Sequence, residues 1–295
     1  MASTTTLETV TSADGTPIAY ERTGSGPPLV LVHGMAGDHT RWELFEVRAA
    51  FAEHCTVYAI DRRGRGESGD SAERSSAGQP KADASGDSVE YNLEREFEDV
   101  AAVVDAIDEP VVLLGHSYGA TCALEAPLRT DNLQKLVLYE GDVPWQIVGP
   151  HLYSEEMHAE MEALLDDGEN EQVLVLFLRE VVELSPAQID ELRSAPSWVA
   201  RVEAAHTLPR EYRAPADYEF DAVRFEGVTT PTLLLVGSES PQWAKDATEA
   251  LYEALPNSRI AVLEGQGHVA MNTAPDLFVD EVLAFIRGSD EADQL

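Results

Sequence analysis

The sequence predicts an α/β protein, because short apolar runs alternate along the chain with stretches of helical periodicity. The runs Pro28–Val32, Val111–Leu114 and Thr230–Val236 have the length and apolar character of strands buried on both faces. Residues Tyr91–Ile107 carry apolar side chains at spacings of three and four, which is typical of an amphipathic helix. A core of alternating strands and helices therefore accounts for most of the chain.

The second of these runs leads into the motif Gly115-His116-Ser117-Tyr118-Gly119. The residues after it, Ala120–Glu125, can form a helix. A strand that turns sharply into a helix around such a motif holds the serine hydroxyl outward, and it needs small residues where the two backbones nearly touch. The helix start also places N–H groups where a developing oxyanion would lie. This pattern predicts that Ser117 is a nucleophile.

The chain begins with a predicted hairpin, since Asp14-Gly15 is a turn signal between Leu7–Ser12 and Pro17–Glu21. The strand Pro28–Val32 then ends in the loop His33-Gly34-Met35-Ala36-Gly37. Such a glycine-bracketed loop can direct the N–H of Met35 toward the nucleophile, where it would pair with the N–H of Tyr118 as an oxyanion hole. The alternative is a plain tight turn.

A helix over Thr40–Ala52 and a strand over Cys55–Ile60 are expected next. The loop Asp61–Ser68 contains three arginines and two glycines, but it lacks the G-K-[ST] of a phosphate-binding loop. We expect it to be a scaffold in which Asp61 and the arginines pair with one another. Residues 70–88 are rich in small and polar residues and predict a mobile surface insertion.

From residue 141 to residue 227 the sequence predicts only helices. This divides the protein into an α/β core, residues 1–140 and 228–295, and a helical cap, residues 141–227. The expected cap helices are Tyr153–Asp166, Glu169–Leu184, Pro186–Ser194 and Pro196–His206. The residues expected to form an apolar roof over a pocket are Trp145, Trp198, His206 and Tyr212. Any one of these aromatic residues is more simply explained as core of the cap.

After the cap, the strand Thr230–Val236, the helix Trp243–Leu255 and the strand Arg259–Leu263 restore the α/β pattern. His268 follows a Gly-Gln-Gly turn at the end of the last strand. A histidine there lies on a loop that can reach a serine elsewhere. A final helix is expected over Leu277–Ile286.

The charge balance is unusual. Lys and Arg total 20 against 54 Asp and Glu, so the formal net charge is −34. Such a surface repels nucleic acid and anionic membranes, and it is typical of a halophilic protein in screening salt. No secretory signal is visible, and Cys55 and Cys122 are expected to be buried free thiols of a cytoplasmic protein.

In chain order, these motifs resemble the α/β-hydrolase superfamily over residues 7–287. The resemblance implies a mostly parallel eight-stranded sheet flanked by helices, with a helical cap inserted after the sixth strand. It also implies Ser117 as nucleophile, His268 as general base and then acid, and the N–H groups of Met35 and Tyr118 as oxyanion donors. No cofactor and no metal are expected.

The third catalytic group departs from the family pattern. The family places an Asp three residues after the glycine that ends the seventh strand, and here that residue is Ser240. A serine cannot stabilise the imidazolium that forms during the reaction. Glu140, at the end of the sixth strand, is the preferred substitute, with Glu239 and Asp142 as alternatives.

The predicted function is a cofactor-independent, carboxylesterase-like hydrolase of small, fairly hydrophobic substrates, acting through an acyl-enzyme. Related folds also carry out carbon–carbon bond hydrolysis, lyase and perhydrolase chemistry, and a ligand-binding protein with little turnover is a further alternative. The expected partner is a small molecule rather than nucleic acid or a membrane, and the expected state is a monomer or a small homo-oligomer.

Overall fold

The computed structural model describes residues 5–70, 91–144, 147 and 153–288. Most of the predicted insertion, residues 71–88, and Trp145 lie outside the described residues.

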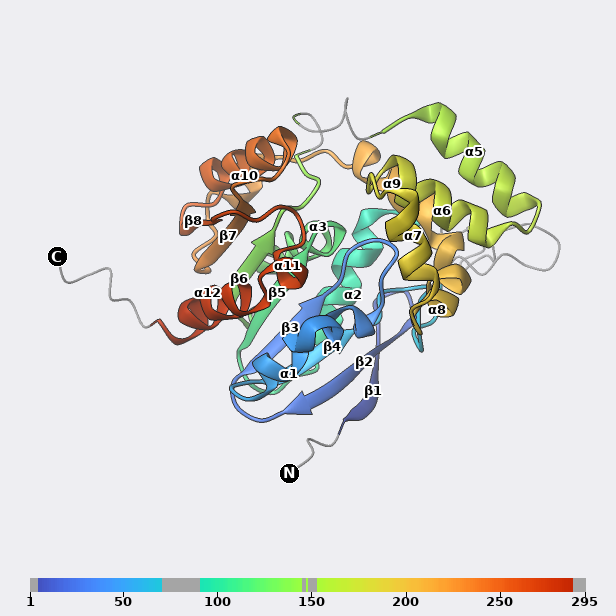
Figure 1. The fold of residues 1–295 in the computed structure, drawn as a ribbon. Coiled ribbons are helices and arrows are strands. Elements are labelled where there is room, and N and C mark those ends of the chain that lie inside the picture. Colours follow the sequence, from blue (N-terminus) through green and yellow to red (C-terminus); the bar gives the residue numbers. More distant parts are fainter. Residues whose placement is uncertain (1–4, 71–90, 145–146, 148–152, 289–295) are drawn as a thin grey trace.

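The described strands form one eight-stranded sheet in the order β1-β2-β4-β3-β5-β6-β7-β8 (Figure 1). β1 pairs antiparallel with β2, β2 pairs antiparallel with β4, and every later pairing is parallel. The predicted α/β fold with its mostly parallel eight-stranded sheet is therefore confirmed. The strands are β1 (Thr6–Thr11), β2 (Pro17–Gly24), β3 (Pro28–Val32), β4 (Thr56–Ile60), β5 (Val111–His116), β6 (Leu133–Tyr139), β7 (Thr232–Gly237) and β8 (Ser258–Leu263).

Helices cover both faces of this sheet. One face carries α2 (Leu93–Asp105), α3 (Tyr118–Ala123) and α10 (Gln242–Ala254). The opposite face carries α1 (Val47–Ala52), α11 (Ala270–Thr273) and α12 (Pro275–Arg287). Along β5, Leu113 joins the first core and Leu114 the second. Alternate residues of a strand point to opposite faces, so a strand covered on both faces must be apolar at every position.

A separate group of helices lies between β6 and β7 in the chain and gathers on one side of the molecule (Figure 1). It consists of α5 (Glu155–Asp166), α6 (Asn170–Glu180), α7 (Pro186–Arg193), α8 (Trp198–Glu203), the 3₁₀ helix η4 (Ala204–Thr207) and α9 (Leu208–Asp217). These helices share a hydrophobic core of their own. The division into an α/β core and a cap at residues 141–227 stays a prediction.

Helix α9 extends the helical segment beyond the predicted end at His206. Pro209 lies in its first turn, where a missing N–H costs no hydrogen bond, so this proline does not stop the helix. Two further 3₁₀ helices, η3 (Ala126–Leu128) and η5 (Ala222–Phe225), complete the connections. No described helix has the length and apolar composition needed to cross a lipid bilayer.

The prediction of one helix over Thr40–Ala52 is wrong. The segment forms the 3₁₀ helices η1 (His39–Trp42) and η2 (Leu44–Glu46) before α1. Phe45 and Glu46 have φ angles of 55° and 60°, which no right-handed helix accommodates. The apolar pattern of this segment places Trp42, Phe45, Val47 and Phe51 on or near its buried side. Trp42, Val47 and Phe51 are buried as expected, but Phe45, at the backbone break, is exposed.

The prediction that Asp61 pairs with the neighbouring arginines is also wrong. Its carboxylate accepts from the imidazole Nδ1 of His39 (2.7 Å) and from the backbone N–H groups of His39 (3.0 Å) and Glu67 (3.1 Å). These donors lie on both sides of the loop and close it around the short Asp side chain. The arginines bind carboxylates from other elements instead.

Arg62 and Arg65 form a buried charge network with two glutamates. Arg62 donates to Glu96 of α2 (Nη2–Oε1 2.9 Å) and lies 2.7 Å from Glu211 of α9. Arg65 donates to the same Glu211 (Nη2–Oε2 2.7 Å). All four side chains are buried. The loop therefore acts as a scaffold, as expected, by joining α2 to α9.

The pKa of Glu96 reflects this network. Burial acts to raise the pKa, but the charge and hydrogen bonds of Arg62, together with Arg63 and Arg65, outweigh burial and lower it to about 2. An unfolded glutamate titrates near pH 4.3, roughly. The stabilisation is therefore complete above that pH and is lost as the pH falls toward about 2.

We expect Glu96→Gln to lower the free energy of unfolding near neutral pH by about 3 kcal/mol, because it leaves a buried guanidinium only partly compensated. The deficit should shrink as the pH falls from about 5 to about 3, where the wild-type carboxylate begins to lose its advantage. Urea denaturation at several pH values and one fixed KCl concentration measures this.

Glu249→Gln is the matched control, since Glu249 is exposed on α10. It should change the free energy of unfolding little at any pH. A deficit in Glu96→Gln that stays constant with pH would contradict the charge network as its cause.

Candidate active site

Ser117 lies at the corner between β5 and α3. Its φ and ψ angles of 56° and −130° fall outside the usual regions for a residue with a side chain. The corner is tight. A Cβ on Gly119 would lie 2.2 Å from the carbonyl oxygen of Val32, and a Cβ on Gly115 would lie 2.3 Å from that of Gly119. Both glycines of the motif are thus required by close backbone approach, as the sequence predicted.

The loop after β3 lies directly against this serine. A Cβ on Gly34 would be 3.4 Å from the Ser117 hydroxyl oxygen. Tyr118 is the first residue of α3, so its N–H has no partner within the helix. Among the described residues, no recorded hydrogen bond engages the N–H of Met35 or of Tyr118. The two predicted oxyanion donors therefore belong to segments that meet at Ser117.

His33 holds this loop in place from inside the protein. Its Nε2 accepts from the backbone N–H of Arg62 (3.3 Å), so its Nδ1–H donates to the carbonyl of Gly34 (2.8 Å). Burial, followed by the charges of Arg62 and Arg65, lowers the pKa of His33 well below its ordinary value. The ring is neutral at physiological pH and serves as a fixed spacer.

The loop that carries His268 is attached beside Ser117. The Nε2–H of His116 donates to the carbonyl of His268 (2.7 Å), and the two rings lie 4.8 Å apart between centroids. The hydroxyl of Tyr139 donates to the carbonyl of Gly267 and accepts from the N–H of Ala270 (3.1 Å). These bonds fix the loop on both sides of His268, which remains partly exposed.

Glu140 is the carboxylate that faces His268. Its Oε2 accepts from the Nδ1–H of His268 at 2.7 Å. Its Oε1 accepts from the backbone N–H of Gly237 (2.8 Å) and from the hydroxyl of Ser240 (2.5 Å). The Glu140 side chain is fully buried, and its backbone φ of 49° turns it out of the path of β6. With Nδ1 engaged, His268 keeps Nε2 as its proton acceptor.

The two alternative acids have other positions. Glu239 is exposed, and the interaction recorded for it is a backbone bond to Gln266 (2.8 Å). Asp142 accepts from the hydroxyl of Thr121, while its own N–H donates to that hydroxyl oxygen (3.1 Å). Burial raises the pKa of Asp142. Of the three carboxylates, the structure places Glu140 on His268.

The residues predicted as an apolar roof are ordinary structural residues where they are described. Trp198 packs under the guanidinium of Arg193, and Tyr212 accepts from the N–H of Ser154 (2.8 Å). His206 is exposed and lies 3.4 Å from Asp70. No group of three or more potential metal ligands occurs among the described residues.

Two contributors to the site were missed from the sequence. The hydroxyl of Tyr139 bonds the loop that carries His268. In the sequence, Tyr139 appears only as the last apolar residue of a buried strand. Ser240 occupies the position where the family resemblance implies an Asp. Its hydroxyl donates to Glu140, and this contact was not predicted. The absence of an Asp at position 240 could therefore have indicated that a carboxylate from another element lies within hydrogen-bond distance of Ser240.

Comparisons with known proteins identify the family of this chain. The sequence profile of a family described as "Alpha/beta hydrolase family" matches residues 29–281. An alpha/beta hydrolase from Sphaerobacter thermophilus of known structure is 32% identical, with a TM-score of 0.73 over 95% of this chain and 100% of that chain.

Curated relatives at lower identity carry names of hydrolases. A Haemophilus influenzae protein named "Putative esterase/lipase" is 25% identical over 279 residues, covering 90% of this chain and 85% of that protein. An Agrobacterium fabrum protein named "Putative carbamate hydrolase RutD" is 25% identical over 269 residues, covering 90% and 95% respectively.

We expect Gly119→Ala to disrupt the corner, because the new methyl group would overlap backbone carbonyl oxygens of β3 that have no free space to move into. The variant should unfold at a lower temperature by several degrees or fail to fold, as differential scanning calorimetry would show. Gly227→Ala is the matched control, since a Cβ there meets nothing within 4 Å. Equal melting temperatures for the two variants would contradict the tight corner.

Proposed function

Because this chain belongs to the alpha/beta hydrolase family, we propose that it is a cofactor-independent serine hydrolase that cleaves esters of small molecules through an acyl-enzyme. The observation that carries the proposal is the 2.7 Å bond between His268 Nδ1 and Glu140 Oε2, in a loop attached beside Ser117. A histidine oriented by a buried carboxylate next to a serine on a strained corner is the arrangement that activates a hydroxyl group.

In the proposed reaction, His268 Nε2 accepts the hydroxyl proton as Ser117 Oγ attacks the ester carbonyl. The N–H groups of Met35 and Tyr118 stabilise the oxyanion of the tetrahedral intermediate. The imidazolium, stabilised by Glu140, gives its proton to the departing alkoxide and leaves an acyl-enzyme. Water then attacks the acyl group as His268 Nε2 accepts its proton. His268 returns this proton to Ser117 Oγ when the bond to the acyl group breaks, which releases the carboxylic acid product and restores the free serine.

The bonds of Glu140 also bear on the alternative of a binding protein without turnover. Ser240 stands where the family usually has its Asp, and a missing catalytic acid would favour this alternative. Because Ser240 donates to Glu140, and Glu140 bonds His268, the serine is part of an arrangement that holds an acid against the base. This supports an active hydrolase.

The same machinery acts on any acyl group with a suitable leaving group, and a carbamate is therefore the second candidate substrate. The 25% identical relative named as a carbamate hydrolase supports it. We place esters first because the leaving alkoxide of an activated ester needs less assistance from His268 than an amine does.

The test is hydrolysis of a short p-nitrophenyl ester series by the wild type, Ser117→Ala, Glu140→Gln and Glu239→Gln, in buffers from low to multimolar KCl. Ser117→Ala should abolish the covalent reaction. Glu140→Gln should lower kcat by about 10²–10⁴-fold, since an amide both loses the charge that stabilises the imidazolium and favours the wrong tautomer of His268.

Glu239→Gln is the matched control, because Glu239 is an exposed carboxylate one residue from Ser240. It should leave kcat close to that of the wild type. Labelling with a fluorophosphonate gives an independent measurement, since only an activated serine reacts. A folded wild type that neither turns over esters nor carries a label at Ser117 would overturn the proposal.

Ser240→Ala should lower kcat by about 3- to 30-fold, because it removes one hydrogen bond to a buried carboxylate and leaves the other two intact. Ser240→Thr, which retains the hydroxyl, should recover much of the rate. Ser258→Ala, at the start of β8, removes a hydroxyl that bonds a backbone carbonyl far from Glu140 and is the control. Equal rates in Ser240→Ala and wild type would contradict a positioning role.

A further inference from the structure

Two arginines beside the proposed active site lack the partners that most other arginines have. The chain has 54 acidic residues for 20 basic ones, and most described arginines bind at least one carboxylate. Arg41 of η1 and Arg201 of α8 are half-buried, yet among the described residues neither forms an ion pair. In so acidic a protein, an arginine sheltered from solvent without a carboxylate is an exception that calls for an explanation.

Both guanidinium groups are tied to the loops of the site. Nη1 of Arg201 donates to the carbonyl of Ala36 (2.5 Å), the residue after Met35. Nη1 of Arg41 donates to Oδ1 of Asn272 (2.7 Å), four residues after His268. One arginine is thus attached to the loop of the proposed oxyanion hole and the other to the segment that follows the proposed base.

The charge of Arg201 acts on Arg41, which has no ion-pair partner among the described residues. Burial, followed by the charge of Arg201, lowers the pKa of Arg41 to about 10. Burial also lowers the pKa of Arg201, whose Nε is buried without a hydrogen-bond partner. The charge of Asp38 acts in the opposite direction on Arg201, but Asp38 Oδ1 already accepts from the N–H of Thr40 (2.9 Å).

The charge of Arg41 also reaches the residues that hold the proposed base. It contributes to the lowered pKa of His116, after burial and the charge of His268, and it opposes the raised pKa of Tyr139. Arg41 is also bonded to the segment that carries His268, because the N–H of its partner Asn272 donates to the carbonyl of Val269 (2.8 Å), the residue after His268.

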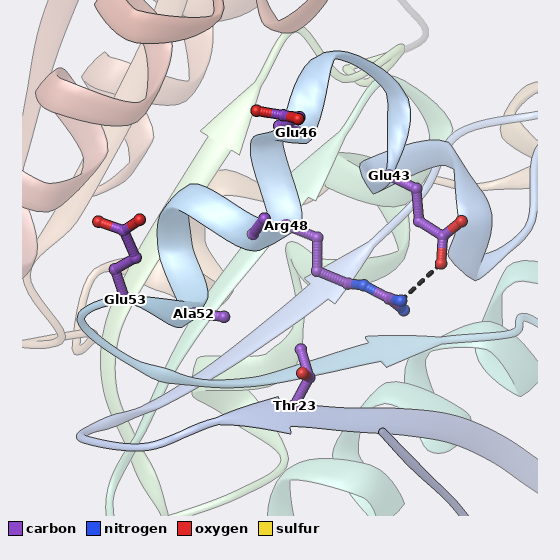
Figure 2. A pocket seen from close by; sticks show the side chains of 7 residues that line it. Thr23, Glu43, Glu46, Arg48, Ala52 and Glu53 are labelled. Carbon is purple, nitrogen blue, oxygen red and sulfur yellow. Dashed lines mark hydrogen bonds and ion pairs between the residues drawn. The ribbon is translucent and has the colours of Figure 1, made fainter. Parts of the chain in front are cut away.

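Arg48 shows the contrasting case. It lines a surface hollow of about 400 Å³ beside α1, together with Glu43, Glu46 and Glu53 (Figure 2). Its guanidinium is occupied by Glu21 (2.6 Å) and by Glu43 (2.5 Å), the bond drawn dashed in Figure 2. That hollow therefore offers no free cation to an anion, whereas the pair at the active site does.

We propose that Arg41 and Arg201 together bind a carboxylate carried by the substrate, so that the preferred substrates are esters of small molecules with a free acid group. The proposal rests on the proposed function for the bond that is cleaved, but not for the binding of the carboxylate. A guanidinium fork matches the geometry of a carboxylate, and one anion shared by two arginines relieves their mutual repulsion.

The net charge of −34 does not argue against such a substrate. In salt of about 1 M the Debye length is about 3 Å, so the distant surface acids are screened. A half-buried pair of arginines is screened much less. Local charge at the site then decides which small anions bind.

The experiment compares an anionic ester with its neutral counterpart. One pair, 3-acetoxybenzoate and its methyl ester, carries the acid on the leaving group, and mono-4-nitrophenyl adipate and its methyl ester carry it on the acyl group. The readout is the ratio of kcat/KM for the anionic ester to that for the neutral ester. In at least one pair, Arg41→Gln and Arg201→Gln should each lower this ratio by about 10- to 100-fold relative to the wild type.

Two further variants sharpen the comparison. Arg41→Lys keeps the charge but not the fork and should recover part of the ratio. Arg48→Gln removes an arginine that is already paired and should leave the ratio unchanged. Ratios that are the same in wild type, Arg41→Gln and Arg201→Gln for both pairs would overturn the carboxylate subsite and leave the esterase proposal standing.

A binding measurement separates this proposal from the proposed function. In the Ser117→Ala background, 3-acetoxybenzoate or adipate at fixed KCl should raise the melting temperature more than the methyl ester or dimethyl adipate does. Adding Arg41→Gln should remove that difference, whether or not the wild type hydrolyses any ester. Equal shifts for the anion and its neutral counterpart, or shifts that persist in the double variant, would overturn the subsite.

Discussion

Where β5 turns into α3, the backbone leaves no space for one additional methyl group. Gly119 lies against the carbonyl oxygens of Val32 and His33, and this contact brings the N-terminus of α3 onto the loop after β3. The strained backbone of Ser117 costs on the order of 1–3 kcal/mol, and the two apolar cores that enclose β5 hold it in place. The positions of the Ser117 hydroxyl and of the two proposed oxyanion donors, the N–H groups of Met35 and Tyr118, depend on this close approach at Gly119.

The scarcity of basic residues makes the arrangement of the buried arginines informative. Arg62 and Arg65 use their charges to join α2 and α9 to the loop after β4, where Glu96 and Glu211 meet them. Such a network is stabilising only because every charge in it has a close partner of opposite sign. Arg41 and Arg201 are half-buried and have no such partner among the described residues. For this reason we propose them as the binding site of an anion.

Most of the fold could be predicted because strands covered on both faces have to be apolar, and that pattern is local. The break at Phe45 could not, since it depends on tertiary contacts that outweigh local propensity. Helix α9 was missed for a local reason, because Pro209 lies in its first turn, where a proline is tolerated. Glu140 was the preferred acid from its place at the end of the sixth strand, but the left-handed backbone at Glu140, with a φ of 49°, has no signal in the sequence. The approach of Arg201 to the active-site loops joins residues far apart in the chain, and one sequence alone carries no signal for it.

The strands that precede the proposed nucleophile Ser117 and the proposed acid Glu140, β5 and β6, are immediate neighbours in the sheet. His116 pairs with Tyr139 across β5 and β6, and the N–H of Ser117 donates to the carbonyl of Tyr139 (2.8 Å), one residue before Glu140. The backbone spacing between Ser117 and Glu140 is therefore set by the hydrogen bonds that pair β5 with β6. His268, by contrast, lies on the loop after β8 and does not follow directly from either of these strands. The alignment of His268 with the other two groups therefore depends on the bonds that His116 and Tyr139 make to its loop.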